Sequence, residues 1–126
     1  MRSWNLALRL GLEIAALTGL GIAAWNQTEG AARSIAVVVA PLAAAALWGV
    51  FNVLDDPSRS GQAPIEVPGW VRLLIELLVL GSGGVAYGVA GYPVIGAAFA
   101  VLTVVHYTVG RARVHWLLSR PAQAQR

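Results

Sequence analysis

Two glutamates stand inside apolar stretches of the chain, and each follows an arginine by four residues: Glu13 follows Arg9, and Glu76 follows Arg72. Residues four apart lie on one face of an α-helix, so each pair is expected to share a face. Charged side chains in such apolar surroundings are costly, which makes them candidates for a functional site. His106 lies in a later apolar stretch and is a further group that can exchange a proton.

Our first hypothesis for these residues is a charged intramembrane cavity that binds a small ligand or another membrane protein. The rise of an α-helix places several other polar or aromatic side chains at a similar depth. The expected ligand contacts are Arg9, Arg72, Trp48, Asn52 and Tyr107.

Two alternatives remain open. One is an intramembrane enzyme that uses Glu13, Glu76 and His106 as acids or bases on a hydrophobic substrate, in epoxide hydrolysis, isomerisation or cyclisation. The other is a structural subunit or scaffold, because two arginines and two glutamates cancel in charge and can hold helices together. In that case we expect Arg9 to pair with Glu76 across two helices. Arg72 would pair with Glu13 in the same way.

Four apolar stretches carry these residues and cover positions 4–25, 34–54, 68–90 and 93–110. Only 12% of the residues are charged, against about 25% in a soluble globular protein. Each stretch has the length of a helix that crosses a hydrocarbon core of about 30 Å. We therefore predict an all-α fold, a membrane four-helix bundle made by residues 1–113 and followed by a cytoplasmic tail of residues 114–126.

The first and third stretches carry the same Arg-x-x-x-Glu motif. In a bundle of four successive spans they run in the same direction. The motif therefore predicts two parallel-repeated helical hairpins, related by a pseudo-twofold axis along the membrane normal.

The basic residues predict the orientation of the helices. All nine are arginines, and counting outward from the helices only Arg33 falls on the side opposite the termini. Because arginines and lysines concentrate on the cytoplasmic side, both termini are expected in the cytoplasm, in a multi-pass protein of the cell membrane. The excess of basic residues lies at the helix ends, as in a protein of the lipid bilayer. The bilayer is therefore the expected partner of this protein, and no nucleic-acid partner is expected.

Small residues recur every four positions in the first stretch, at Ala7, Gly11, Ala15 and Gly19. Such a stripe lets two helix backbones approach closely. It lies opposite Glu13 on the helix, so a homodimer through this face is one hypothesis. The alternative is that the stripe faces a neighbouring helix or lipid.

No metal site and no cofactor are expected. The chain has no cysteine, which excludes thiolate ligands. The acidic pair Asp55-Asp56 lies in the polar loop between the second and third stretches and is expected to be solvated, because no other ligand cluster is near it in the sequence.

The chain resembles the YrdB-like family of small bacterial membrane proteins of unknown function. The resemblance rests on three segments, and the fourth stretch matches least. These segments are residues 5–9 with Glu13, residues 41–42 with the Leu-Trp-Gly-Val-Phe run at 47–51, and residues 72–79. The resemblance implies a four-span protein of the bacterial inner membrane, with no established activity.

Overall fold

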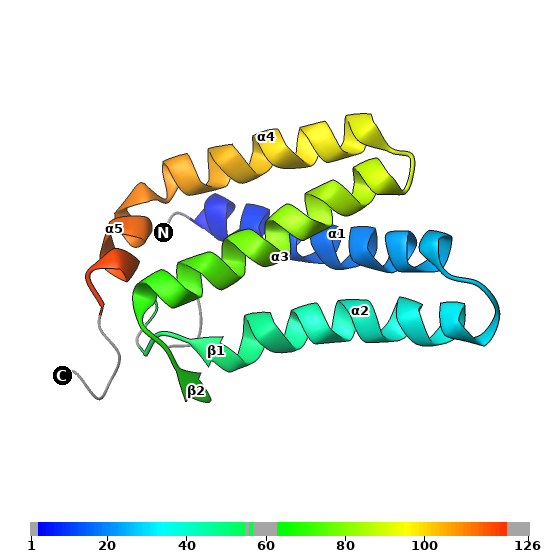
Figure 1. Ribbon diagram of the computed structural model, residues 1–126. Coiled ribbons are helices and arrows are strands. Elements are labelled where there is room, and N and C mark those ends of the chain that lie inside the picture. The colour runs from blue at the N-terminus through cyan, green and yellow to red at the C-terminus, as the bar shows by residue number, and fades with distance from the viewer. Residues whose placement is uncertain (1–2, 55, 57–62, 121–126) are drawn as a thin grey trace.

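The computed structural model of the 126-residue chain describes residues 3–54, 56 and 63–120. These residues form five helices and a pair of two-residue strands: α1 (Ser3–Gln27), α2 (Gly30–Val50), β1 (Phe51–Asn52), β2 (Ile65–Glu66), α3 (Gly69–Val89), α4 (Pro93–Val109) and α5 (Arg111–Leu118). Figure 1 shows the long helices side by side, with α5 and the strands at one end. Apart from the small strand pair, the predicted all-helical class is confirmed.

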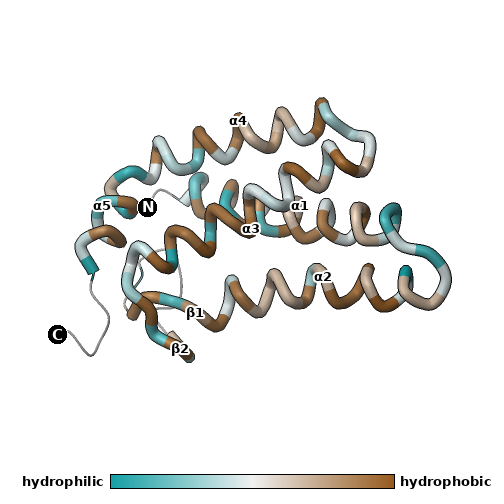
Figure 2. Tube along the Cα trace, in the orientation of Figure 1, coloured by the Kyte–Doolittle hydropathy of each residue, from teal (hydrophilic) through white to brown (hydrophobic). Residues whose placement is uncertain are grey.

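Three of the helices, α1, α2 and α3, are each long and apolar enough to cross a membrane. Together, α4 and α5 make a fourth candidate, with a bend of 71° between them. Apolar residues run along the middle of the helices, and polar residues gather toward their ends (Figure 2). Large apolar side chains such as Leu42, Leu78 and Val94 stay exposed on the outside. An apolar exterior of this kind suits a lipid environment, as predicted for a protein with several spans.

The pair α1 and α3 forms the centre of the fold, with α2 packed on α1 and α4 packed on α3. Gly83 permits the close approach of the two central helices, because a Cβ there would lie 2.6 Å from the Cα of Ala16. Gly19 lies against the ring of Tyr87 in the same contact. By contrast, a Cβ at Gly11 would meet no heavy atom within 4 Å. The small-residue stripe of α1 is therefore divided between a helix contact and an open face.

The end of α2 is set by a side chain from α3. The Nη1 atom of Arg72 donates to the carbonyl oxygens of Trp48 and Phe51. The last carbonyls of a helix have no partner within the helix, so this arginine satisfies the carbonyl of Trp48. It also binds the carbonyl of Phe51, the first residue of β1. The helix stops at Val50, four residues before the predicted end.

After α2 the chain continues as β1, which pairs in parallel with β2. The bounds of α3 and α4 agree with the predicted stretches to within one residue. Residues 111–118 form α5, so the expected tail begins inside a helix. Gly69 at the start of α3 allows this helix to dock, because a Cβ there would lie 1.5 Å from the carbonyl oxygen of Leu117.

Candidate functional site

The carboxylate of Glu76 is the centre of a charged cluster and has no exposed side-chain surface. Its Oε2 atom lies 2.8 Å from Nε of Arg72 and 3.1 Å from Nη2 of Arg9. Arg113 donates through Nη1 to Oε1 at 2.9 Å and through Nη2 to Oε2 at 2.6 Å. The hydroxyl of Tyr107 donates to Oε1 at 2.8 Å. Four helices, α1, α3, α4 and α5, thus supply donors or cations to one buried carboxylate.

Arg113 also binds a second carboxylate, which belongs to the segment between α2 and α3. Its Nε and Nη2 atoms donate to the two oxygens of Asp56 at 2.9 and 2.6 Å. The prediction that the acidic pair is solvated was wrong for Asp56, which is 2% exposed. Asp55 lies outside the described residues.

The indole of Trp48 lies beside two members of this cluster. The guanidinium carbon of Arg9 is 5.2 Å from the ring centroid, and that of Arg72 is 5.1 Å from it. Both distances are within the range of a cation–π contact. Trp48, expected as a ligand contact, therefore also helps to accommodate two buried cations.

The members of the cluster that the structure describes are balanced in charge. The Arg9–Glu76 pair expected across two helices is present, and each arginine of the two motifs also contacts the glutamate four residues later. Within the part of the chain that the structure describes, three arginines face three carboxylates, so the formal charges of these six residues cancel, which reduces the cost of burying them. The members are Arg9, Glu13, Asp56, Arg72, Glu76 and Arg113.

Of the four charged residues in the two Arg-x-x-x-Glu motifs, Glu13 has the most exposed side chain. Its Oε1 lies 3.4 Å from Nε of Arg9, and 22% of its side chain is exposed. It lines a pocket of about 210 Å³ between α1, α2 and α3, together with Leu17, Ala45, Trp48, Gly49 and Val79. The two copies of the motif therefore place their glutamates in opposite environments.

Trp48, which lines the same pocket, has a buried indole N–H group. Its Nε1 atom is buried and has no hydrogen-bond partner in the part of the chain that the structure describes. The residue as a whole is 6% exposed. A buried donor without a partner costs about 1–3 kcal/mol, and its burial separates this N–H group from the open space of the pocket.

His106 is buried and bonded to Asn5 near the start of α1. The Nδ2 atom of Asn5 donates to the backbone carbonyl of His106, at 3.3 Å, and its Oδ1 lies 2.9 Å from Nδ1 of the ring. Because Oδ1 can only accept, Nδ1 carries the proton of the neutral ring. His106 is 2% exposed. This histidine joins α4 to α1 and is not among the residues that line the Glu13 pocket.

Asn52, the remaining predicted ligand contact, is 3% exposed. Its Nδ2 atom donates to the carbonyl oxygen of Gly49 at 2.7 Å, close to the end of α2. It is not a lining residue of the pocket beside Glu13. Within the described residues, no group of three or more metal-ligand side chains is present.

Three residues of the polar network were not predicted as site residues: Asn5, Asp56 and Arg113. In the sequence Arg113 is one of several arginines near the C-terminus, and its position is explained by membrane orientation alone. Asp56 stands in a turn-rich loop next to another aspartate. The sequence offers one signal for Asp56 and Arg113, namely that a neutral buried network needs one carboxylate for each arginine. This rule does not identify which residues pair.

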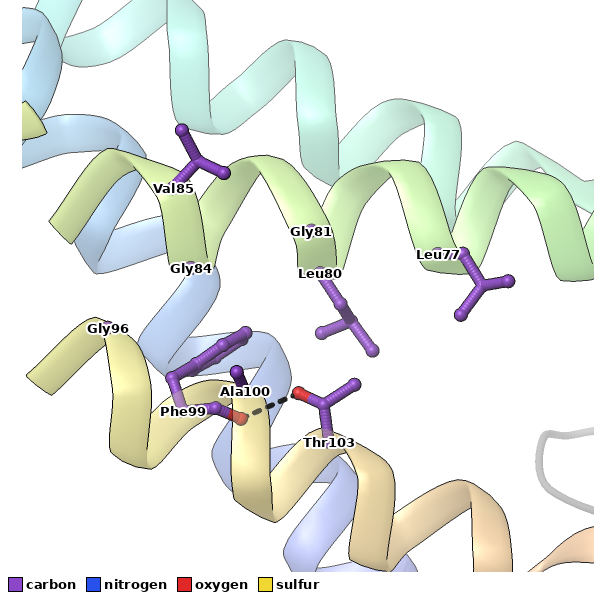
Figure 3. Close-up of a pocket in the computed structure, with 9 residues that line it drawn as sticks. All are labelled: Leu77, Leu80, Gly81, Gly84, Val85, Gly96, Phe99, Ala100 and Thr103. Carbon is purple, nitrogen blue, oxygen red and sulfur yellow. Dashed lines mark hydrogen bonds between the residues drawn. The ribbon is translucent and has the colours of Figure 1, made fainter. Parts of the chain in front are cut away.

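A second hollow lies between α3 and α4 and has a volume of about 360 Å³ (Figure 3). Leu77, Leu80 and Phe99 supply much of its apolar lining. The hydroxyl of Thr103 is bonded to the carbonyl oxygen of Phe99 in its own helix. Its described lining residues therefore offer no charged side chain comparable to Glu13.

Comparisons with known proteins agree with the resemblance seen in the sequence. A family model described as "Protein of unknown function (DUF2568)" matches residues 7–104, a range that includes both Arg–Glu motifs and Trp48. The chain is 40% identical over 116 residues to the "Uncharacterized protein YrdB" of Bacillus subtilis (strain 168), a match that covers 92% of this chain and 94% of that relative. No solved structure matches the chain significantly. The resemblance to the YrdB-like family is confirmed, and the chain belongs to the DUF2568 family of proteins of unknown function.

Proposed function

We propose that this protein is a four-helix bundle of the bacterial cell membrane that binds a small ligand in the pocket beside Glu13. In this proposal both termini lie in the cytoplasm, and the charged cluster occupies the cytoplasmic half of the membrane. The buried ion pairs hold the helices in place, and the accessible glutamate contacts the ligand.

The observation that carries this proposal is the contrast between the two glutamates. The side chain of Glu76 is fully buried and meets three arginines and a tyrosine. That of Glu13 is 22% exposed and lines a pocket. A carboxylate that only balances the charge of buried arginines is expected to be buried with them. A carboxylate that contacts a ligand must instead face a space that the ligand can enter.

The same contrast argues against the enzyme hypothesis. A substrate has no route to Glu76, because its oxygens are already bonded and its side chain has no exposed surface. Among the described residues that line the pocket, Glu13 is the one with an acidic or basic side chain. Catalysis by an acid and a base requires two such groups or one group with a bound water. Binding therefore explains the geometry with fewer assumptions.

Mass spectrometry of the intact protein tests the proposal. The protein is extracted from its own membrane in a mild detergent and compared with the variants Glu13→Gln and Trp48→Phe. We expect a small molecule to be retained by the wild-type protein and lost from both variants. Thr103→Val, in the separate hollow of Figure 3, is the matched control and is expected to retain it. Equal adducts in all four proteins, or none in any, would leave the scaffold hypothesis as the better explanation.

Membrane orientation is tested independently with single cysteines, since the natural chain contains none. Cysteines placed at Ser3 and Ser119 are expected to be protected from an impermeant thiol reagent in intact cells. A cysteine at Thr28, in the loop between α1 and α2, is expected to react. The opposite labelling pattern would reverse the proposed orientation.

A further inference from the structure

We infer that α5 binds the headgroups of anionic phospholipids, with the exposed guanidinium of Arg111 as its cationic contact. This surface lies at one end of the bundle, apart from the pocket beside Glu13, so the inference goes beyond the proposed function. It is carried by the depth of α5 in the membrane, by the side chains that α5 exposes and by the surroundings of Arg111.

Exposed aromatic side chains mark two levels on the outside of the helices. Trp4 and Trp70, near the starts of α1 and α3, are exposed at one end of the bundle, and Trp25 and Tyr92 are exposed at the other (Figure 1). At 1.5 Å per residue, the rise from Trp4 to Trp25 is about 32 Å, which matches a hydrocarbon core of about 30 Å. Because tryptophan and tyrosine gather at both membrane–water interfaces, the two levels correspond to the two surfaces of a bilayer.

The helix α5 lies at the level of the tryptophans that begin α1 and α3. Asn5, the residue after Trp4, is bonded to His106 in the last turn of α4, so α5 begins near that level. At the other end of α5, the N–H of Gly69 in α3 donates to the carbonyl oxygen of Arg120 at 2.9 Å. A bend of 71° separates α4 from α5. The helix α5 therefore runs along the membrane surface instead of continuing through the bilayer.

The outer side of α5 has the composition of a helix in the headgroup region. Basic, aromatic and aliphatic side chains are combined there, as is typical of helices that lie in a membrane interface. The exposed or partly exposed members are Arg111, His115, Trp116 and Leu118. The helix contains no acidic residue, so none of its own side chains repels a negatively charged lipid.

The two arginines of α5 have different surroundings. Arg113 is buried and donates to Asp56 and Glu76 in the interior. Arg111 is exposed, and within the part of the chain that the structure describes it makes one hydrogen bond, from Nη1 to the carbonyl oxygen of Thr108 at 3.4 Å. A guanidinium has five N–H donors, so most of those of Arg111 remain for an acceptor outside the protein. The phosphate oxygens of a lipid headgroup accept such bonds, which are strengthened by the opposite charges.

The charge of this end of the molecule favours an anionic lipid over a zwitterionic one. The sequence has no aspartate or glutamate after Glu76, whereas four arginines follow it, at positions 111, 113, 120 and 126. A zwitterionic headgroup carries a cation of its own, which arginines repel. A headgroup such as phosphatidylglycerol brings negative charge alone. One arginine near the membrane surface is expected to strengthen binding of an anionic lipid about fivefold.

The test measures which lipid lies next to α5. Ala112 is exposed on this helix, and because the natural chain has no cysteine, Ala112→Cys gives a single site for a fluorophore. The labelled protein is placed in phosphatidylcholine nanodiscs, and brominated phosphatidylglycerol or brominated phosphatidylcholine is added as a quencher. We expect half-maximal quenching by phosphatidylglycerol at a mole fraction about fivefold lower than by phosphatidylcholine. Equal midpoints, or no quenching by either lipid, would overturn the inference.

Arg111→Gln in the labelled protein is the deciding variant, and it leaves the interior ion pairs in place. We expect it to raise the phosphatidylglycerol midpoint about fivefold, to that of phosphatidylcholine. Arg33→Gln is the matched control, because it removes the same charge near Trp25 at the opposite end of the bundle. Its midpoint is expected within twofold of the wild-type value. An equal effect of the two substitutions would assign the preference to net charge and overturn the role of Arg111.

Two conditions separate a lipid headgroup from a free anion as the occupant. Excess inorganic phosphate is expected to leave the phosphatidylglycerol midpoint unchanged, because acyl chains in the bilayer hold the lipid beside α5. Displacement by phosphate would identify a free-anion site and overturn the inference. Raised ionic strength is expected to weaken the preference, since salt screens exposed charges, and a preference that salt leaves unchanged would contradict the ionic contact. None of these outcomes depends on Glu13, so they are independent of the proposed function.

Discussion

Arg113 of α5 holds Glu76 of α3 through two parallel hydrogen bonds, Nη1 to Oε1 at 2.9 Å and Nη2 to Oε2 at 2.6 Å. Such a bidentate pair fixes the relative orientation of the two groups as well as adding binding energy. The same guanidinium binds Asp56 through Nε and Nη2. One side chain from the short α5 therefore joins the segment after α2 to the middle of the helix assembly.

Loss of Arg113 is expected to be strongly destabilising. Arg113→Gln leaves Asp56 and Glu76 with less compensating charge while both remain buried, and removal of one partner of a buried ion pair costs about 3–5 kcal/mol. Thermal unfolding in detergent measures the effect. Arg111→Gln, at an exposed arginine of the same helix, is the control and should change stability by about 0.5 kcal/mol or less. Equal stability of the two variants would contradict the assigned role of Arg113.

The two glutamates of the repeated motif are expected to respond differently to the same substitution. Glu76→Gln leaves three arginines around a neutral amide, so we expect a loss of several kcal/mol. Glu13→Gln removes a partly exposed partner of Arg9, which keeps Glu76, and should cost about 1 kcal/mol or less. Chemical denaturation of both variants gives the comparison. Similar losses in the two would mean that Glu13 is also a structural counter-charge.

The hydroxyl of Tyr107 is expected to contribute measurably to stability. It donates to Oε1 of Glu76 at 2.8 Å, and a hydrogen bond to a charged group contributes about 1.5–3 kcal/mol. Tyr107→Phe removes this bond and keeps the ring, which packs edge-on against His106. The matched control is Tyr92→Phe at an exposed position, for which no loss is expected. Unfolding midpoints that agree within error would refute this contribution.

Gly69→Ala is expected to detach α5 from the start of α3. A Cβ at this position would lie 1.5 Å from the carbonyl oxygen of Leu117, a backbone atom that cannot rotate away. Hydrogen exchange of the α5 amides should therefore increase in the variant, together with exchange of the Gly69 position, whose N–H donates to Arg120. Gly81→Ala, where a Cβ meets nothing within 4 Å, should leave α5 protected. Unchanged exchange of α5 in Gly69→Ala would show that the contact is dispensable.

The tautomer of His106 offers a spectroscopic check on the contact between α4 and α1. Since Asn5 Oδ1 accepts from the ring, the proton is expected on Nδ1 at neutral pH. Long-range ¹H–¹⁵N correlation spectra distinguish the two ring nitrogens. Asn5→Ala removes the acceptor and should shift the population toward the Nε2–H form, which is the commoner tautomer in free histidine. A wild-type ring with its proton on Nε2 would contradict the assigned hydrogen bond.

Much of the secondary structure follows from local composition. The bounds of α3 and α4 were predicted to within one residue, because Pro68 and Pro93 begin apolar stretches of about the length that a membrane requires. The end of α2 was placed four residues too late. Its apolar stretch continues to Leu54 in the sequence, but Arg72 binds the carbonyl oxygens of Trp48 and Phe51 and fixes the helix end earlier.

For the charged site, too, the sequence identifies some of the residues and the tertiary structure decides the others. The repeated spacing of Arg9 with Glu13 and of Arg72 with Glu76 was sufficient to single out these four residues, because charges in an apolar helix are costly and i,i+4 positions share a face. Of the two glutamates only Glu76 is fully enclosed, and Arg113 and Asp56 complete its surroundings. These features depend on contacts between residues 37 and 57 positions apart in the sequence. Hydropathy and periodicity are local properties, whereas the partner of a buried charge is decided by how the helices pack.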